Sequence, residues 1–201
     1  MRSAAEEYFP VLYKRLLRED PQLLDHQRNT ALFASHFGRM LGLTSEELDL
    51  LKTAAELHDL GKICIPLEVR QKPGLLSPDE RRLVRLHPLA GAALASLFRE
   101  LAPASFFILT HHERPDGRGY PLALKGSEIP FLSRVLGLCD AVCAMLEERP
   151  YSPQKTADEV ISELEEGAGT QFDPDLVRFF LCFCTEMLFK KVNGEWTFSQ
   201  L

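Results

Sequence analysis

Apolar residues recur at every third or fourth position along most of the chain, a pattern typical of helices that bury one face. Cap residues and acidic first turns mark several helix starts, of which residues 44–47 and 77–80 are the strongest. Pro10 weakens the middle of the first predicted helix. The pattern predicts helices over residues 4–19, 21–41, 44–59, 89–99, 103–112 and 131–148, one opening at Ser77, and two more after Ser152-Pro153 and Asp173-Pro174.

Segments rich in helix breakers separate these helices. Pro66 and Pro73 indicate that residues 63–74 form irregular chain. Only the tail, residues 191–201, suggests strands, as a small hairpin around Asn193-Gly194. The predicted fold class is therefore all-α, without internal repeats. We expect an N-terminal helix or linker remnant over residues 1–20 and one main domain over residues 21–201.

The composition is that of an ordinary globular protein, since 45% of the 201 residues are hydrophobic and 26% are charged. A formal net charge of −6 argues against general nucleic-acid binding, so no DNA partner is expected. The five cysteines form no CxxC pair, which fits a reducing compartment. No signal peptide is visible, and no apolar run reaches membrane-spanning length. These features predict a cytoplasmic protein without membrane insertion.

Candidate chemistry begins at the end of the third predicted helix, in residues 55–62. Leu51, Ala55 and His58 recur at helical spacing and share the buried face, with Asp59 just beside it. Burying an imidazole and a carboxylate is costly unless they have partners or a metal. Two interpretations of this stretch stay open: a metal site, or a His and an Asp that satisfy each other.

The rest of the chain supplies further metal-ligating side chains. Of its six histidines, five lie at helix faces or breaks beside apolar sequence, and two of those are adjacent. Histidine and carboxylate groups are natural ligands of divalent transition metals. His36 is interpreted as an ordinary histidine. Coincidence is the weaker explanation for a set that consists of His26, His58, Asp59, His87, His111, His112 and Asp140.

Two motifs resemble those of a known family. Residues 58–62, His-Asp-Leu-Gly-Lys, resemble the signature of the HD superfamily of metal-dependent phosphohydrolases. Residues 111–121, His-His-Glu-Arg-Pro-Asp-Gly-Arg-Gly-Tyr-Pro, resemble the motif of its HD-GYP subfamily, whose members hydrolyse the bacterial messenger cyclic di-GMP. The resemblance extends collinearly over roughly residues 21–185, so the main domain is identified as an HD-GYP domain. It implies an HD-type helical bundle with a dinuclear metal centre in its core.

The resemblance implies two divalent metal ions, iron or manganese first, with zinc, nickel or magnesium as alternatives. One ion would be held by His26, His58, Asp59 and Asp140, and the other by His87, His111 and His112, with Asp59 bridging the two. Such a pair supplies a nucleophile at neutral pH and neutralises charge on phosphoryl oxygens. Asp59 and Lys62 are the expected catalytic residues, because Lys62 is placed to stabilise the developing charge.

Substrate contacts are expected from Lys62, Tyr120 and Arg149, with Arg149 holding the second phosphate of the ligand. The loop over residues 117–121 has two interpretations. The favoured interpretation is structural, with its glycines providing the turn after the metal histidines. In the alternative, the loop shapes the substrate pocket or contacts a GGDEF-domain partner. Supporting positions around the metals and the loop are Cys143, Arg114 and Asp116. A second copy of the same chain, in a homodimer, is a further candidate partner.

Several positions depart from the family pattern. Gln22 stands where members with a third metal have Glu, which predicts two ions rather than three. Cys143 replaces a second Asp three residues after Asp140, and is interpreted as a small buried residue rather than a ligand. The other replacements are Asn29 for a usual Arg, Leu67 for a usual Asp and Ser152 for a usual basic residue.

Three hypotheses for function follow. The first is a phosphodiesterase that hydrolyses cyclic di-GMP to linear pGpG, GMP or both in bacterial signalling. The second, favoured by Cys143 and Ser152, is a module that binds metals and a cyclic dinucleotide or protein partner without turnover. The third is a phosphodiesterase for another cyclic dinucleotide such as cyclic GMP-AMP, because the pocket residues do not settle base identity.

Overall fold

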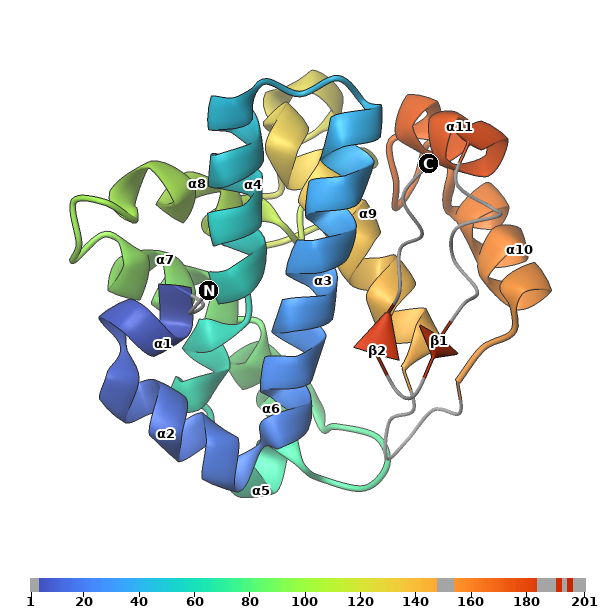
Figure 1. Ribbon diagram of the computed structural model, residues 1–201. Helices are drawn as coiled ribbons and strands as arrows, with labels where there is room; N and C mark the ends of the chain where they lie inside the picture. The colour runs from blue at the N-terminus through green and yellow to red at the C-terminus, as the bar shows by residue number, and fades with distance from the viewer. Residues whose placement is uncertain (1–3, 148–153, 184–190, 193–194, 197–201) are drawn as a thin grey trace.

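The computed structural model describes residues 4–147, 154–183, 191–192 and 195–196, whose arrangement Figure 1 shows. The regular structure of this part of the chain is helical apart from two two-residue strands, which confirms the predicted fold class. The α-helices are α1 (Ala4–Tyr8), α2 (Pro10–Glu19), α3 (Pro21–Met40), α4 (Ser45–Leu57), α5 (Leu67–Arg70), α6 (Pro78–Val84), α7 (His87–Ala95), α8 (Ser105–Thr110), α9 (Phe131–Leu146), α10 (Ala157–Gly167) and α11 (Pro174–Phe183). The short 3-10 helices are η1 (Leu60–Cys64), η2 (Ala102–Ala104) and η3 (Gly126–Glu128), and the strands are β1 (Lys191–Val192) and β2 (Glu195–Trp196).

Helices α3, α4 and α9 form the centre of the fold and pack against one another. Helix α7 packs against α8 and η1 on one side of this centre, and α10 and α11 lie on the other side (Figure 1). Phe33 and Phe37 of α3 are buried and meet the ring of Phe180 of α11 edge to face. The C-terminal ends of α4 and α8 and the start of α7 are thereby brought close to α3 and α9, where the candidate ligands lie.

The first predicted helix is divided into two. Helix α1 ends at Tyr8 and α2 begins at Pro10, because the proline ring disfavours helical geometry at the residue before it and removes one backbone donor. Phe9, at the break, turns inward and meets the ring of Phe98 edge to face at a centroid distance of 5.1 Å. The prediction that Pro10 only weakens one continuous helix was therefore wrong at that point.

Two other segments differ from the prediction. Residues 63–74 are not irregular throughout, because η1 extends to Cys64 and α5 forms after Pro66. The buried guanidinium of Arg70 fixes α5 by donating to Asp20 Oδ2 at 3.0 Å and to the carbonyl of Ile65 at 3.2 Å. Helix α7 begins at His87 rather than at Leu89, since Pro88 is tolerated in a first turn, and it ends at Ala95.

The tail contains the predicted hairpin strands. Strands β1 and β2 pair antiparallel, with Lys191 opposite Trp196 and Val192 opposite Glu195. The turn residues Asn193 and Gly194 lie outside the described residues. Within the described part of the chain, none of the helices combines the length and the apolar character needed to span a lipid bilayer.

Candidate metal centre

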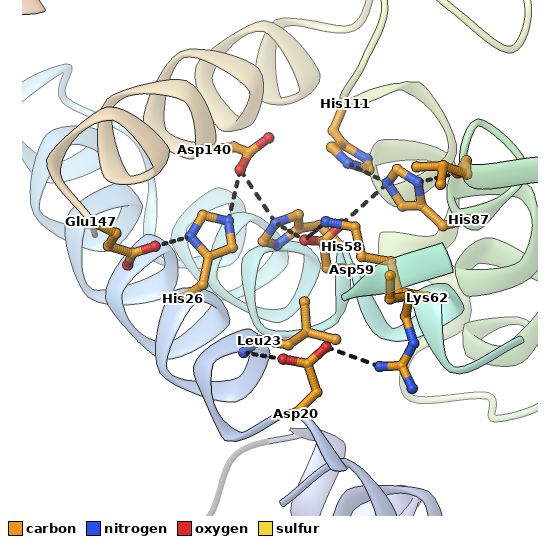
Figure 2. A network of polar contacts seen from close by, with 12 residues as sticks. Asp20, Leu23, His26, His58, Asp59, Lys62, His87, His111, Asp140 and Glu147 are labelled. Atoms are coloured by element: carbon orange, nitrogen blue, oxygen red, sulfur yellow. Dashed lines mark hydrogen bonds and ion pairs between the residues drawn. The ribbon is translucent and has the colours of Figure 1, made fainter. Parts of the chain in front are cut away.

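The seven predicted metal ligands converge in two adjoining groups, and Figure 2 labels all of them except His112. One group consists of Asp59, His87, His111 and His112, and the other of His26, His58 and Asp140; within each group the candidate ligand atoms lie within 4.8 Å of one another. The groups combine residues from α3, the end of α4, the start of α7, the end of α8 and the middle of α9. In the part of the chain that the structure describes, these are the groups of three or more that could hold a metal ion.

Three of the histidines are oriented by a carbonyl three residues earlier. Nδ1 of His58 donates to Ala55 O at 2.8 Å, and Nδ1 of His87 donates to Val84 O at 2.8 Å. Nδ1 of His111 donates to Ile108 O at 2.6 Å. These acceptors belong to the last turns of α4, α6 and α8, where helix carbonyls have no backbone partner of their own. The contacts place the hydrogen on Nδ1 and leave the Nε2 lone pair free to bind a metal.

One glycine lets the backbones that present these ligands approach closely. A Cβ atom at Gly61 of η1 would lie 2.0 Å from the carbonyl oxygen of His87 and 2.5 Å from the amide nitrogen of Gly91 in α7. Only a residue without Cβ fits this contact. Gly61 of the His-Asp-Leu-Gly-Lys motif therefore brings the segment that contains His58 and Asp59 against the start of α7.

Asp59 connects the two groups. Its Oδ1 lies 3.1 Å from His87 Nε2, and its Oδ2 lies 3.5 Å from His58 Nε2. Lys62 Nζ donates to Oδ2 at 2.5 Å, a contact drawn in Figure 2. The Asp59 side chain is 2% exposed, whereas that of Lys62 is 25% exposed, so the ammonium lies at the rim of the buried carboxylate. A carboxylate with one oxygen toward each histidine group has the geometry of a bridging ligand.

His26 is oriented differently from the other histidines. Its Nε2 lies 2.8 Å from Asp140 Oδ1, and its Nδ1 lies 2.7 Å from Glu147 Oε2. The second oxygen of Glu147 accepts from Asn29 Nδ2 at 2.9 Å. Asp140 Oδ1 also lies 3.5 Å from His58 Nε2 and so joins the two rings. Sequence reasoning did not identify Glu147, whose only signal was a carboxylate one turn beyond Cys143 on the same helix face.

Burial and neighbouring charges shift the histidine pKa values in opposite directions. Burial lowers the pKa of His111 well below its usual value, and the neighbouring imidazoles, His112 foremost, lower it further. Burial also lowers the pKa of His112 to about 3. Burial opposes a charge on His26 as well, but its hydrogen bonds with Asp140 and Glu147 raise its pKa to about 9. His111 and His112 are therefore neutral at pH 7, the form of imidazole that binds metals.

Both aspartates are ionised in this environment. Burial alone would raise the pKa of Asp59, but Lys62, His58 and His87 hold it well below its usual value. Burial would likewise raise the pKa of Asp140, and its hydrogen bond with His26 together with the adjacent His58 ring holds it well below the usual value. The two groups thus combine ionised carboxylates with imidazole nitrogens, which is a donor set suited to divalent transition metals.

The arrangement of lone pairs tests whether these residues fit a metal. His87 Nε2 and His111 Nε2 lie only 3.4 Å apart, although both rings place their hydrogen on Nδ1. In neutral rings two acceptor atoms therefore face each other. His58 Nε2 and Asp59 Oδ1 are among the buried polar atoms that have no hydrogen-bond partner within the described residues. Buried acceptors that converge without donors need a cation between them, so the residues fit divalent ions.

The loop after the adjacent histidines is fixed by Glu113. Both of its carboxylate oxygens accept backbone hydrogens, from Leu122 N at 2.6 Å and from Leu124 N at 2.9 Å. The Tyr120 ring lies against the ring of His112 at a centroid distance of 4.8 Å, and the Arg85 guanidinium lies 5.2 Å from the Tyr120 centroid. The loop therefore holds Tyr120 directly beside a candidate ligand, and Glu113 and Arg85 are contributors that the sequence did not reveal.

The remaining predicted positions divide into three cases. Arg114 and Asp116 form an ion pair at 2.6 Å inside the loop, which favours a structural role for them. Cys143 is buried at 2% exposure in the hydrophobic core and belongs to neither ligand group found among the described residues. Arg149 and Ser152 lie outside the described residues.

The sequence matches the HD domain family over residues 10–176. It is similar to a cyclic di-GMP phosphodiesterase of Vibrio cholerae serotype O1, with 41% identity over 146 residues, which are 69% of this chain and 30% of the relative. It is also similar to the 3'3'-cGAMP-specific phosphodiesterase 2 of the same organism, with 34% identity over 158 residues, which are 78% of this chain and 30% of the relative. The chain therefore spans under a third of the length of these two curated relatives.

Among solved structures, the HD domain of the phosphodiesterase PgpH from L. monocytogenes has a similar fold. The TM-score is 0.61 at 18% identity, and the superposition covers 89% of this chain and 97% of that one. At this level of identity the likeness shows that the helical architecture is shared.

Proposed function

Because the chain belongs to the HD-domain family, we propose that it is a metal-dependent phosphodiesterase that hydrolyses a cyclic dinucleotide. Cyclic di-GMP is the first candidate substrate, with linear pGpG, GMP or both as products, since relatives at up to 41% identity are named cyclic di-GMP phosphodiesterases. The proposal rests above all on the buried pair of ligand groups that Asp59 connects. Such a pair is the arrangement that phosphodiester hydrolysis requires.

We assign the ligands as the sequence motifs suggested. One ion would be held by His26, His58, Asp59 and Asp140, and the other by His87, His111, His112 and Asp59. Iron and manganese suit this mixture of imidazole and carboxylate best, and zinc, nickel and magnesium are the alternatives. When bound, the two ions supply Lewis-acid stabilisation of the phosphoryl oxygens and a water of lowered pKa.

The protein's own side chains bind and orient the substrate. Lys62 lies at the rim of the centre, where its ammonium can stabilise negative charge that develops on a phosphoryl oxygen. Tyr120 lies against His112, so a nucleotide that reaches the ligands meets its ring. We keep Arg149 as the proposed ligand of the second phosphate, because a guanidinium binds phosphate in a bidentate manner.

A binding module without turnover is the second candidate. The specific observation in its favour is that Cys143 lies buried in the core where the family usually has a second Asp. A buried thiol is a poorer proton acceptor than a carboxylate. A GGDEF-domain partner, a homodimer and a cytoplasmic location stay predictions from the sequence.

The test is hydrolysis of cyclic di-GMP and of 3'3'-cGAMP by protein loaded anaerobically with iron or manganese, followed by chromatography beside elemental analysis. We expect linear product at two metals per chain, and no product from His58→Ala. Product from 3'3'-cGAMP alone would move the substrate to the class of the second relative. Two bound metals with intact substrate, together with product formation after Cys143→Asp, would favour the binding module.

A further inference from the structure

Glu147, directly after the last residue of α9, lies outside every motif that indicated the metal centre. Its Oε2 lies 2.7 Å from His26 Nδ1, and its Oε1 accepts from Asn29 Nδ2 at 2.9 Å, as Figure 2 shows for the contact with His26. We infer that Glu147 is a positioning residue that fixes the ring of His26 for metal binding and is itself held by Asn29. The inference rests on the proposed function, since it concerns one ligand of the same centre.

His26 needs such a partner because of its place in the fold. His58, His87 and His111 lie at or just beyond helix ends and reach carbonyls of a last helical turn. His26 lies inside the 20-residue helix α3, where backbone carbonyls accept from the amides four residues later. Its Nδ1 therefore has to find a side-chain acceptor, and the one it meets comes from a residue 121 positions away.

The contact gives the ring the properties of a good ligand. A hydrogen on Nδ1 that is donated to a carboxylate fixes the tautomer and the ring orientation and raises the basicity of Nε2. The Nε2 atom then points to Asp140 Oδ1 at 2.8 Å, inside the candidate ligand group. The side chains of His26 and Glu147 are 5% and 16% exposed, so water competes little for this hydrogen bond.

The same helix face explains why a carboxylate here matters for this chain. Asp140 and Cys143 lie three residues apart on one face of α9, and Glu147 follows directly beyond the helix end, where its side chain reaches the same His26 ring as Asp140. Cys143 provides no carboxylate where the family usually has one. Glu147 provides a carboxylate one turn further along, and Asn29, which stands at a usual Arg position, donates to it.

The experiment uses Mn²⁺ alone as the probe, so that it does not depend on turnover. Wild type, Glu147→Ala and Glu165→Ala are titrated anaerobically with Mn²⁺ against a competing chelator, and their electron paramagnetic resonance spectra are recorded. Glu165 is an exposed residue of α10 and provides the matched control. We expect Glu147→Ala to bind one of two ions about 10–100-fold more weakly, as outer-shell partners of metal histidines do when mutated. Its spectrum should change from a coupled pair to an isolated ion, which a general loss of stability would not produce.

Two further variants keep the inference falsifiable if Glu147→Ala fails to fold. Glu147→Gln preserves the shape but offers only one oxygen for the donors His26 and Asn29, and Asn29→Ala removes one of these two donors. Both should weaken the same ion, by less than Glu147→Ala does. Wild-type affinity for both ions in all three variants would overturn the inference while the proposed function stands. A wild type that binds no Mn²⁺ would overturn the proposed function as well.

Discussion

His26 and the histidines on the other side of the candidate metal centre are oriented by different means. On the side of His87 and His111, each ring donates to a carbonyl only three residues earlier. On the side of His26, the ring is held by carboxylates of Asp140 and Glu147, which are 114 and 121 residues away. The first side depends on local helix ends, and the second depends on the packing of α3 against α9. The second side should therefore be the more sensitive to changes in tertiary packing.

The electrostatics differ in the same way. Burial and neighbouring imidazoles lower the pKa of His111, whereas hydrogen bonds with two carboxylates overcome burial and raise the pKa of His26 to about 9. The His87 side thus presents imidazole lone pairs, and the His26 side presents more negative charge. Asp59 belongs to both sides. Mutations at Asp59 and in its surroundings should therefore separate the contributions of the two sides to metal binding and activity.

The largest effect is expected from Asp59→Asn, which removes the charge shared by both sides. The amide retains the shape but cannot compensate two cations, so both ions should bind more weakly. We expect phosphodiesterase activity to fall by about 100-fold or more, since even outer-shell changes cost 10–100-fold. Elemental analysis and product chromatography measure the effect, with Asp158→Asn on the exposed face of α10 as control. Loss of a single ion with activity retained would show that Asp59 does not bridge.

The next effect tests the backbone contact that joins Asp59 to α7. Gly61→Ala would place a methyl group 2.0 Å from the carbonyl oxygen of His87, a clash that rotamer changes cannot relieve. We expect a loss of about 3 kcal/mol in the free energy of unfolding, at the top of the range for overpacking. Urea unfolding of the metal-free protein measures it.

Gly91→Ala provides the matched control on the opposite side of this contact. Its Cβ would lie 3.1 Å from Ile108 Cγ2, and the nearest backbone atom, the amide nitrogen of Gly61, would be 3.4 Å away. The substitution should cost much less, because a side-chain methyl can shift and alanine favours the helix by about 1 kcal/mol. Equal effects of the two substitutions would mean that the close backbone approach at Gly61 does not matter for stability.

A smaller and more local effect is expected from Glu113→Gln, which loosens the loop on the His87 side. Glutamine has one oxygen for the two backbone donors at Leu122 and Leu124, so one partly buried N–H would face an amide group. The expected cost is about 2 kcal/mol. Both metals should remain bound while KM rises, since Tyr120 loses its support. Kinetics at saturating Mn²⁺ test this, and loss of a metal instead would place Glu113 in the centre itself.

The smallest effect is expected at His36, the one histidine that the sequence left out of the ligand set. It lies on α3 nearly three turns beyond His26 and is partly exposed. His36→Gln should leave the metal content unchanged and alter stability by within about 0.5 kcal/mol. A change in metal stoichiometry would contradict the assignment of ligands by motif.

The sequence predicted what depends on local pattern. The periodicity and caps indicated α3, α4 and α9 close to their observed bounds and the start of α6, because Pro21, Thr44 and Ser77 are strong local signals. The division at Phe9 and the short helix α5 were missed. At Phe9 the local effect of Pro10 on the preceding residue was underestimated, and α5 depends on the tertiary contact of Arg70 with Asp20, which periodicity does not contain.

The site residues divide in the same way, into those that local sequence pattern reveals and those that depend on tertiary contacts. All seven ligand candidates were identified from motifs, and the structure brings all seven together. Glu147, Asn29 and Arg85 acquire their roles from partners that are distant in the sequence, and no spacing rule connects residues 121 positions apart. Sequence reasoning is therefore strongest on the side of His87 and weakest on the side of His26.

The central claim is that the two ligand groups hold two ions that share Asp59. Anomalous scattering from crystals of the Mn²⁺-loaded protein tests it most directly, because it locates the ions without reference to turnover. We expect two peaks about 3.5–4 Å apart, the separation typical of two-metal sites, with one carboxylate oxygen of Asp59 toward each. A single peak, or two peaks of which only one contacts Asp59, would contradict the account.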